Sequence, residues 1–380
     1  GGQWHCCCCA AKRPAAEVMN LLFADIEALL GGAVGSAFPS ASLSFGQSSQ
    51  PNTIAVGDAS LETWFDIASL TKALSTTLLA MRLVQKQQID LHQEVLPGVR
   101  LDHLLSHSAG FPACFPPLWA QTSGLLDSPS EATRQAVLDA VLATPRDRAG
   151  QRSLYSDLGF ILLGSLIEQR GEARLDDLLA DWLGPLALAL SYRPIDRRSP
   201  IAAALVAPTR RETPQREPLR GVVHDDTARA MLGVAGHAGL FAQSASVYRL
   251  GQALLDCYHD EDTADARVLG LRPDIVRRFF ALPALPGLPG TWGLGFDHPD
   301  PLDPNKTSSS SAGTLWSRQG VGHLGFTGCS IWIDPQIRLV AVLLSNRVFV
   351  ATTAEADASK SALRALRPAV HDAIARLHCR

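Results

Sequence analysis

The chain has 380 residues, of which 46% are hydrophobic, and 34 basic against 37 acidic residues give a net charge of −3. This length and composition suit one large domain or two smaller ones around a sizeable core. No basic block is present, which argues against nucleic acid and anionic membranes as partners. No apolar run reaches the roughly 18 residues of a membrane-spanning helix, so we expect no membrane span.

Residues 1–13 are predicted to form a disordered tail. This stretch lacks the apolar segment behind a basic start that defines a standard secretory signal. Four cysteines, Cys6–Cys9, stand together beside His5. Zinc sites need spaced cysteines, so a disordered tail is favoured over a metal site. The other four cysteines are scattered, which argues against a disulfide framework.

The first ninety residues predict two helices separated by three short strands. Pro14 opens a helical pattern that ends at two glycines, a common helix end. Turn residues then separate three short strand patterns, and apolar residues recur at helical spacing after Ser69. In chain order we predict a helix over 14–30, strands over 33–38, 40–46 and 52–58, and a helix over 70–87.

The middle and the end of the chain have different sequence patterns. Residues 91–227 predict short helices joined by loops rich in proline, glycine and arginine. The period then changes to two, which predicts strands over 314–325, 329–335 and 337–347 joined by tight turns, before a last helix over 359–377. Strands joined by such turns pair antiparallel.

We therefore expect an α/β (α+β) fold, in which an antiparallel sheet is flanked by helices and carries an all-helical insertion. Residues 14–90 and 228–380 are predicted to form the α/β sheet domain, and residues 91–227 a mainly helical domain. We expect the functional site in the cleft between the two parts.

Ser69 and Lys72 are the first candidate catalytic residues. Lys72 is one of only five lysines in the chain. Residues three apart on a helix lie on one face, one turn apart. A serine hydroxyl is a weak nucleophile that needs a base, and a lysine can serve when burial and neighbouring charge lower its pKa. The alternative is a serine that caps the helix and a lysine that reaches water.

Tyr155 and Asp157 begin a second apolar helix. A phenol beside an ammonium loses its proton more easily, because the opposite charge favours phenolate. Tyr155 is therefore a candidate proton shuttle, with an ordinary half-buried tyrosine as the alternative. Asp157 is a plausible helix cap.

The stretch "GHLGFTG", with His323 and Gly325, lies in a predicted strand region. Glycines inside a strand mark the close approach of a ligand or of another backbone. Exposed main-chain N–H groups there could hold a carbonyl oxygen, and His323 could hydrogen-bond a substrate. The alternative is a bulge with a satisfied histidine.

The sequence gives weaker evidence of function for the other histidines. His103 and His107 are four apart, like zinc ligands on a helix, but the general-base glutamate of that motif is missing. For His224, Asp225 and His237, a position in the cleft and a structural role are equally well supported by the sequence. We expect no metal and no cofactor.

Three motifs together resemble those of the penicillin-recognising serine hydrolases. They are Ser69–Lys72 ("SLTK"), Tyr155–Asp157 ("YSD") and His323–Gly325 ("HLG"), in that order. The similarity is closest to the class C β-lactamase-like branch, which includes D-Ala-D-Ala carboxypeptidases, D-aminopeptidases and carboxylesterases. It runs from about residue 30 to 375 and implies a β-lactamase/transpeptidase-like fold.

This resemblance implies an acyl-enzyme mechanism. Ser69 Oγ would attack an amide or ester carbonyl, while Lys72 and Tyr155 together remove its proton and later return one to the leaving group. The backbone N–H groups of Ser69 and Phe326 would form the oxyanion hole. Whether Lys72 or Tyr155 is the base stays open, because two coupled groups titrate as a pair.

Substrate contacts would come from Asp157, His323 and Gly325, and two of these depart from class C β-lactamases, which have Asn and Lys where Asp157 and His323 stand. A carboxylate only accepts hydrogen bonds, and a histidine is largely neutral at pH 7. These departures favour a peptidase or esterase over an efficient β-lactamase. The overall pattern, including "VHDDTARAMLGVAGHAGLF", most resembles D-Ala-D-Ala carboxypeptidases, with a carboxylesterase or a weak class C-type β-lactamase as alternatives.

Three readings of function remain. The first is a serine hydrolase acting on a small molecule or short peptide, such as a D-amino-acid peptide, an ester or a β-lactam. The second is a catalytically silent penicillin-binding-fold module, and the third is acyl transfer to an alcohol or amine. The compartment stays open: the bacterial periplasm suits an exported peptidase, and otherwise the protein is cytoplasmic.

Overall fold

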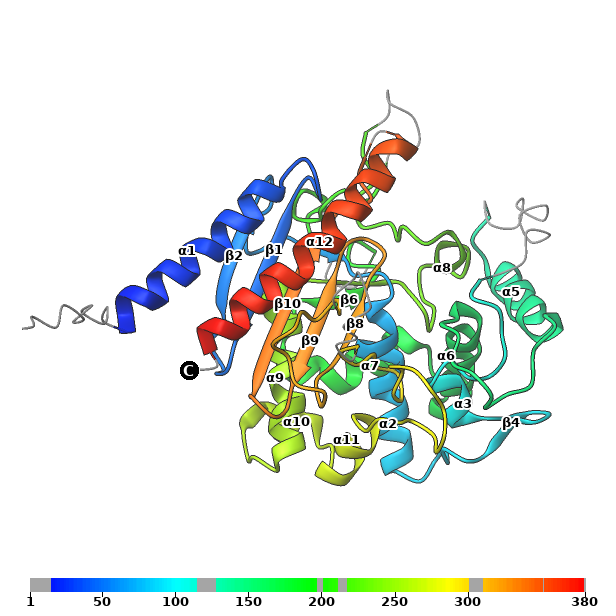
Figure 1. Cartoon of the computed structure of the whole chain (residues 1–380). Coiled ribbons are helices and arrows are strands. Elements are labelled where there is room, and N and C mark those ends of the chain that lie inside the picture. The colour runs from blue at the N-terminus through cyan, green and yellow to red at the C-terminus, as the bar shows by residue number, and fades with distance from the viewer. Residues whose placement is uncertain are drawn as a thin grey trace, which may run out of the picture.

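A five-stranded antiparallel sheet forms the centre of the fold. Its strand order is β2-β1-β10-β9-β8, so strands from the two ends of the chain pair side by side (Figure 1). The predicted antiparallel sheet is confirmed. The strands are β1 (Ala41–Gly46), β2 (Asn52–Val56), β8 (Val321–Leu324), β9 (Ser330–Asp334) and β10 (Leu339–Ser345). The computed structural model describes residues 15–114, 128–196, 201–210, 217–300, 310–350 and 352–378.

Strand β10 is the middle strand of this sheet. Every residue of its sequence "LVAVLLS" is buried, as a run of valine and leucine requires when both faces are covered. It pairs with β1 from Ala41↔Ser345 to Gly46↔Val340 and with β9 on its other side. The N-terminal and C-terminal parts of the chain are therefore joined through one strand.

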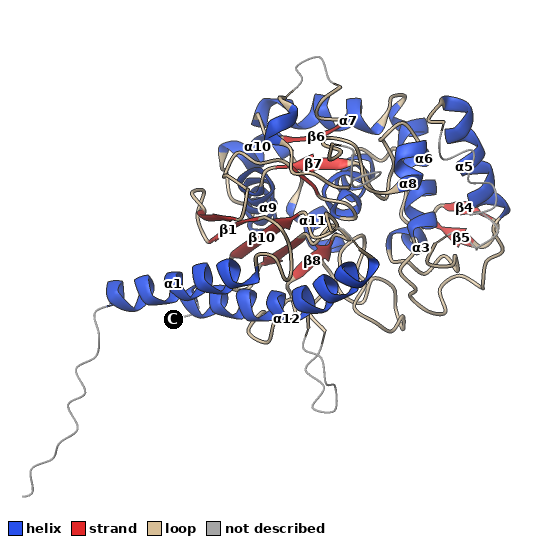
Figure 2. Cartoon of the chain, turned by 90° about the horizontal axis from the view of Figure 1, so that it is seen from above, coloured by secondary structure: helices blue, strands red, loops and turns tan. Residues whose placement is uncertain are grey.

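Helices cover both faces of the sheet. The terminal helices α1 (Ala15–Ala33) and α12 (Thr353–His378) run side by side along one face, as Figure 2 shows. Helix α9 (Ser244–His259) packs on the other face, against β10, β1 and β9. No helix in the described ranges is long and apolar enough to cross a membrane.

The remaining helices form the half of the molecule that lies beyond α9. The interval 91–227, predicted as all-helical, also contains three strands of two or three residues, which are too short to leave a period in the sequence. The helices are α2 (Leu78–Gln85), α3 (Leu101–Leu105), α5 (Glu131–Ala143), α6 (Asp157–Gly171), α7 (Leu175–Leu183), α8 (Asp226–Ala230), α10 (Ala264–Leu269) and α11 (Pro273–Phe279), with the 3₁₀ turns η3 (Gly184–Leu186) and η4 (Ala203–Leu205). Strands β3 (Phe65–Asp66), β7 (Leu240–Ala242) and β6 (Leu190–Tyr192) form a second sheet, and β4 (Glu94–Leu96) pairs with β5 (Val99–Arg100).

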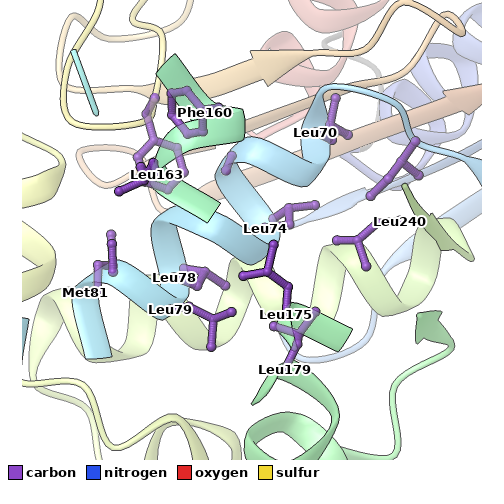
Figure 3. Close-up of a cluster of buried hydrophobic side chains, with 14 of the residues drawn as sticks. Leu70, Leu74, Leu78, Leu79, Met81, Phe160, Leu163, Leu175, Leu179 and Leu240 are labelled. Atoms are coloured by element: carbon purple, nitrogen blue, oxygen red, sulfur yellow. The ribbon is translucent and has the colours of Figure 1, made fainter. Parts of the chain in front are cut away.

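The helix after Ser69 is buried in the main hydrophobic core. The predicted helix over 70–87 is present, but its first part is a six-residue π-helix, η1 (Lys72–Thr77), which continues into α2. Leucines at 70, 74 and 78 contact a cluster that includes Phe160 and Leu163 of α6 and Leu175 of α7 (Figure 3). π-helical turns occur often at functional sites.

Several predicted boundaries were wrong. The predicted strand over 33–38 does not form: α1 extends to Ala33, and only Val34 and Phe38 pair, as an isolated bridge around Gly35, whose φ is +82°. The predicted strand over 314–325 begins only at Val321. Helix α12 begins at Thr353, six residues before the predicted start at 359. The prediction missed these first turns because their polar residues show no apolar periodicity.

We predict that Gly236→Ala destabilises the protein, because a Cβ at this position would lie 2.1 Å from the Phe160 carbonyl oxygen of α6. Overpacking against backbone typically costs about 1–3 kcal/mol. The free energy of unfolding, measured in urea, should fall by that amount. Gly184→Ala is the matched control, because a Cβ there meets no atom within 4 Å. Equal stability of the two variants would contradict the close packing described here.

Candidate active site

The candidate nucleophile Ser69 follows a strained turn. Ala68 has φ +47°, a conformation that costs a residue with a side chain about 1–3 kcal/mol and is found mostly at functional sites. Buried Asp66 holds this turn: its Oδ1 accepts from Ala68 N at 2.8 Å and its Oδ2 accepts from His224 N at 2.7 Å. Burial raises the pKa of Asp66 to about 7. Ser69 is thus presented at the start of the helix, as predicted.

Lys72 is fully buried and uses all three of its donors. Its Nζ donates to Ser69 Oγ at 3.0 Å, to Asp157 Oδ1 at 2.7 Å and to the His237 carbonyl oxygen at 3.0 Å. The same Nζ lies 4.9 Å from the centre of the Tyr155 ring. Three residues predicted as catalytic are therefore in contact, and Lys72 does not reach water.

The direction of the Lys72 pKa corrects the sequence-based expectation. Burial lowers this pKa, but the charge of Asp157 and the interactions with Tyr155 outweigh it, and the net pKa is raised. For Tyr155, burial raises the pKa by more than Lys72 lowers it. The resting site therefore holds an ammonium and a phenol at neutral pH. The sequence could not show the ion pair, because Asp157 lies 85 residues from Lys72.

Asp157 is not the cap of α6. The N-cap position is held by Ser156, whose hydroxyl donates to the Pro112 carbonyl oxygen at 2.5 Å. Asp157 is the first residue of the helix, and its carboxylate turns to Lys72. Acidic side chains are favourable in the first helical turn, so this position serves both the helix and the buried ammonium.

An aromatic cluster surrounds the Tyr155 ring. Its centre lies 4.6 Å from His107, 5.1 Å from Trp292 and 6.0 Å from His323. Trp292 comes from a loop rich in glycine and proline, and the sequence analysis did not single it out. These rings partly bury Tyr155, which still borders the cavity, and this burial is the main cause of its raised pKa.

His323 is neutral and presents an acceptor. Burial lowers its pKa to about 3. Its Nδ1 lies 2.8 Å from the Leu324 carbonyl oxygen, which can only accept, so Nδ1 carries the proton. The Nε2 atom is buried and has no hydrogen-bond partner among the described residues. His323 can therefore accept a hydrogen bond from a ligand, as a lysine in its place could not.

The turn after β8 carries the second candidate oxyanion donor. Residues 325–329 join β8 to β9, closed by a hydrogen bond from Gly325 N to the Cys329 carbonyl oxygen at 2.8 Å. "GHLGFTG" is thus a strand end and a turn, rather than a strand interior. Within the described residues, neither Ser69 N–H nor Phe326 N–H has an intramolecular acceptor. Both residues border the same cavity.

This cavity has a volume of about 730 Å³. Ser69 lies in its wall with Tyr155 and Asp157 from the helical half and His323 from the sheet, so the cavity occupies the predicted cleft. Phe326 stands at the mouth with 60% of its surface exposed. Both acidic and basic residues line the cavity: Asp157, Asp225, Asp226 and Asp297, and Arg347, Lys360, Arg364 and Arg367.

Among the described residues, the remaining histidines considered in the sequence analysis, and Asp225, do not form a metal site. His103 accepts from Arg100 N through Nδ1, and His107 lies beyond the end of α3 with φ +54°, so the two do not share a helix face. His224 and Asp225 line the cavity. His237 lies behind it, its Nε2 2.9 Å from Asp225 Oδ1.

No cluster of three or more potential metal ligands occurs among the described residues. The tail residues His5 and Cys6–Cys9 lie outside them, so the structure does not test the hypothesis of a metal site there.

The chain is similar in sequence and in fold to several known proteins. A putative D-alanyl-D-alanine carboxypeptidase from Salmonella paratyphi A is 29% identical over 321 residues, which cover 76% of this chain and 70% of that protein. Among solved structures, a penicillin-binding protein homolog from Caulobacter crescentus has a TM-score of 0.63 at 20% identity, covering 92% of this chain and 96% of that one. EstCE1, a hydrolase with promiscuous acyltransferase activity, has a TM-score of 0.63 at 19% identity, covering 93% of this chain and 100% of that one. At these identities, the two solved structures show the fold.

A family model decides the assignment. The model described as Beta-lactamase matches residues 27–366, which is most of the chain and includes every candidate site residue. The resemblance seen in the three motifs is confirmed, and the chain belongs to the β-lactamase family of serine hydrolases.

Proposed function

We propose that this serine hydrolase cleaves an amide or ester through an acyl-enzyme on Ser69, as a D-Ala-D-Ala carboxypeptidase or peptidase, or as a carboxylesterase. The observation that carries the proposal is the 3.0 Å hydrogen bond from Lys72 Nζ to Ser69 Oγ at the wall of the cavity. A serine hydroxyl in contact with a candidate base, beside two unpaired backbone N–H groups, is the arrangement that acyl transfer needs.

The proton route in this proposal uses Lys72 and Tyr155 as one unit. Ser69 Oγ attacks the substrate carbonyl, and its proton passes to the pair, which must first have lost one proton. The negative charge on the carbonyl oxygen is held by the N–H groups of Ser69 and Phe326. The pair then protonates the leaving amine or alcohol. Water attacks the acyl-enzyme by the same route and releases the acid.

The substrate side of the cavity supports a peptidase or esterase over an efficient β-lactamase. Asp157 accepts hydrogen bonds and is already paired with Lys72, so it does not offer the donor that an asparagine would supply. His323 is neutral and cannot supply the permanent charge of a lysine. The relatives called putative D-alanyl-D-alanine carboxypeptidases favour the peptidase.

Acyl transfer to an alcohol or amine is the second candidate. It uses the same acyl-enzyme and differs only in the acceptor, and EstCE1 is described as a hydrolase with promiscuous acyltransferase activity. A catalytically silent module is disfavoured, because it would have no need of the buried Lys72 contact with Ser69.

The first experiment compares the wild type with Ser69→Ala and with Ser361→Ala, an exposed serine on α12 that serves as control. We predict turnover of p-nitrophenyl butyrate or of a D-Ala-D-Ala peptide, with a mass adduct on Ser69. Loss of the nucleophile should lower kcat by about 10³-fold or more. Intact-protein mass spectrometry checks the adduct, and a fluorescent penicillin tests the β-lactamase alternative. Equal behaviour of wild type and Ser69→Ala on all three probes would move the silent module ahead.

A second experiment uses pH. The charge of Asp157 raises the pKa of both Lys72 and Tyr155, so Asp157→Asn should let the pair lose its proton at lower pH. We predict that the acid limb of the pH profile of kcat/KM moves toward lower pH in this variant. Asp226→Asn is the control: it removes the same charge from the cavity wall, where Asp226 pairs with Arg210 and Arg229. An acid limb that stays in place, or moves upward, would show that the pair does not govern the rate.

A further inference from the structure

Two buried arginines stand behind the turn 325–329. Arg347 follows β10 and is 4% exposed, and Arg367 lies in α12 and is 7% exposed. Within the described ranges, neither guanidinium forms an ion pair with a carboxylate. The nearby thiol of Cys329 is no counter-ion, because burial raises its pKa to about 11. Burying an uncompensated charge is costly, so these two positions need an explanation that a salt bridge does not give.

Both arginines donate to backbone carbonyls of the turn, while Arg367 Nε is buried without a partner among the described residues. Arg347 donates to the Phe326 carbonyl oxygen from Nε at 3.2 Å and from Nη2 at 2.5 Å. Its Nη1 donates to the Ala356 carbonyl oxygen at 3.3 Å. Arg367 Nη2 donates to the Cys329 carbonyl oxygen at 2.8 Å and lies 3.5 Å from that of Gly325. Because these groups are occupied, Arg347 in particular has little left to offer a substrate anion.

The contacts made by the Gly325 carbonyl oxygen determine the direction of the Phe326 N–H group. In a trans peptide, the N–H points opposite to the C=O of the preceding residue. The Gly325 carbonyl oxygen faces the interior of the turn, where it accepts from Gly328 N at 3.0 Å and meets Arg367. The Phe326 N–H of the same peptide unit must therefore point away from the turn, and it has no acceptor within the described residues. It is the group expected to hold the oxyanion.

We propose that Arg347 and Arg367 are positioning residues of the oxyanion hole: they hold the carbonyls of Gly325, Phe326 and Cys329 so that the Phe326 N–H faces the cavity. This inference rests on the proposed acyl-enzyme function. The guanidinium of Arg367 also polarises the Gly325–Phe326 peptide, which makes its N–H a stronger donor. Two positive charges without a counter-ion thus lie in the cavity wall beside the position where negative charge develops.

The test compares Arg347→Gln and Arg367→Gln with the wild type. Each loses the charge and the forked guanidinium. Arg376→Gln is the control, because Arg376 is an exposed arginine on α12, the helix that carries Arg367. We expect kcat for the ester or peptide to fall about 10- to 100-fold, with KM changed less than about threefold, because only transition-state binding is lost. The Kd of a phenylboronic acid, whose tetrahedral adduct on Ser69 places an oxygen in the hole, should rise in the same proportion as kcat falls.

A kcat within twofold of the wild type in a folded glutamine variant would overturn the proposal. A rise in KM alone would do so as well, since it would mean that the arginines bind substrate. If the glutamine variants do not fold, Arg347→Lys and Arg367→Lys decide: they keep the charge and lose the fork, so a partial fall in kcat is expected and an unchanged kcat refutes the role. A wild type that binds the boronate but turns nothing over would fault the proposed function, while the boronate Kd values would still decide the role of the arginines.

Discussion

The buried ammonium of Lys72 is the group on which the whole site depends. Each of its three N–H groups donates to an acceptor from a different segment: Ser69 before η1, Asp157 at the start of α6, and His237 before β7. An ammonium without these partners would be several kcal/mol less stable inside the protein than in water. The nucleophile, the first turn of α6 and the loop before β7 are therefore placed together or not at all.

The same ammonium sets the chemistry of the cavity. Asp157 favours the protonated form of Lys72, and the rings of His107, Trp292 and His323 partly bury Tyr155. Lys72 and Tyr155 are thus both protonated at rest. The pair can take the proton of the Ser69 hydroxyl only after it has released one of its own protons. Neutral His323 adds no charge of its own and offers an acceptor at Nε2. A substrate group that donates a hydrogen bond can therefore pair with this nitrogen.

The sequence could predict what repeats or what forms a short motif. Strands such as β1 and β10 carry clear apolar patterns, and Ser69, Lys72 and Tyr155 stand in recognisable triplets, so their meeting was foreseen. The direction of the Lys72 pKa was not, because it depends on a carboxylate distant in the chain. Trp292 was missed because its glycine- and proline-rich loop has no period. Arg367 was missed because its partners are carbonyl oxygens, which every residue has and no sequence pattern marks.

The two halves of the candidate oxyanion hole are fastened to each other before any substrate arrives. Thr327 Oγ1, in the turn that carries Phe326, donates to the Asp66 carbonyl oxygen at 2.7 Å, and the carboxylate of Asp66 holds Ala68 N beside Ser69. A Cβ on Gly325 would lie 2.6 Å from the Ile67 carbonyl oxygen, so the two turns touch only because this residue is glycine. Such contacts also explain how the strained φ of Ala68 persists, since the surroundings leave it no other conformation. Donors fixed in this way need no reorganisation when charge develops, which is the condition under which backbone N–H groups stabilise an oxyanion most.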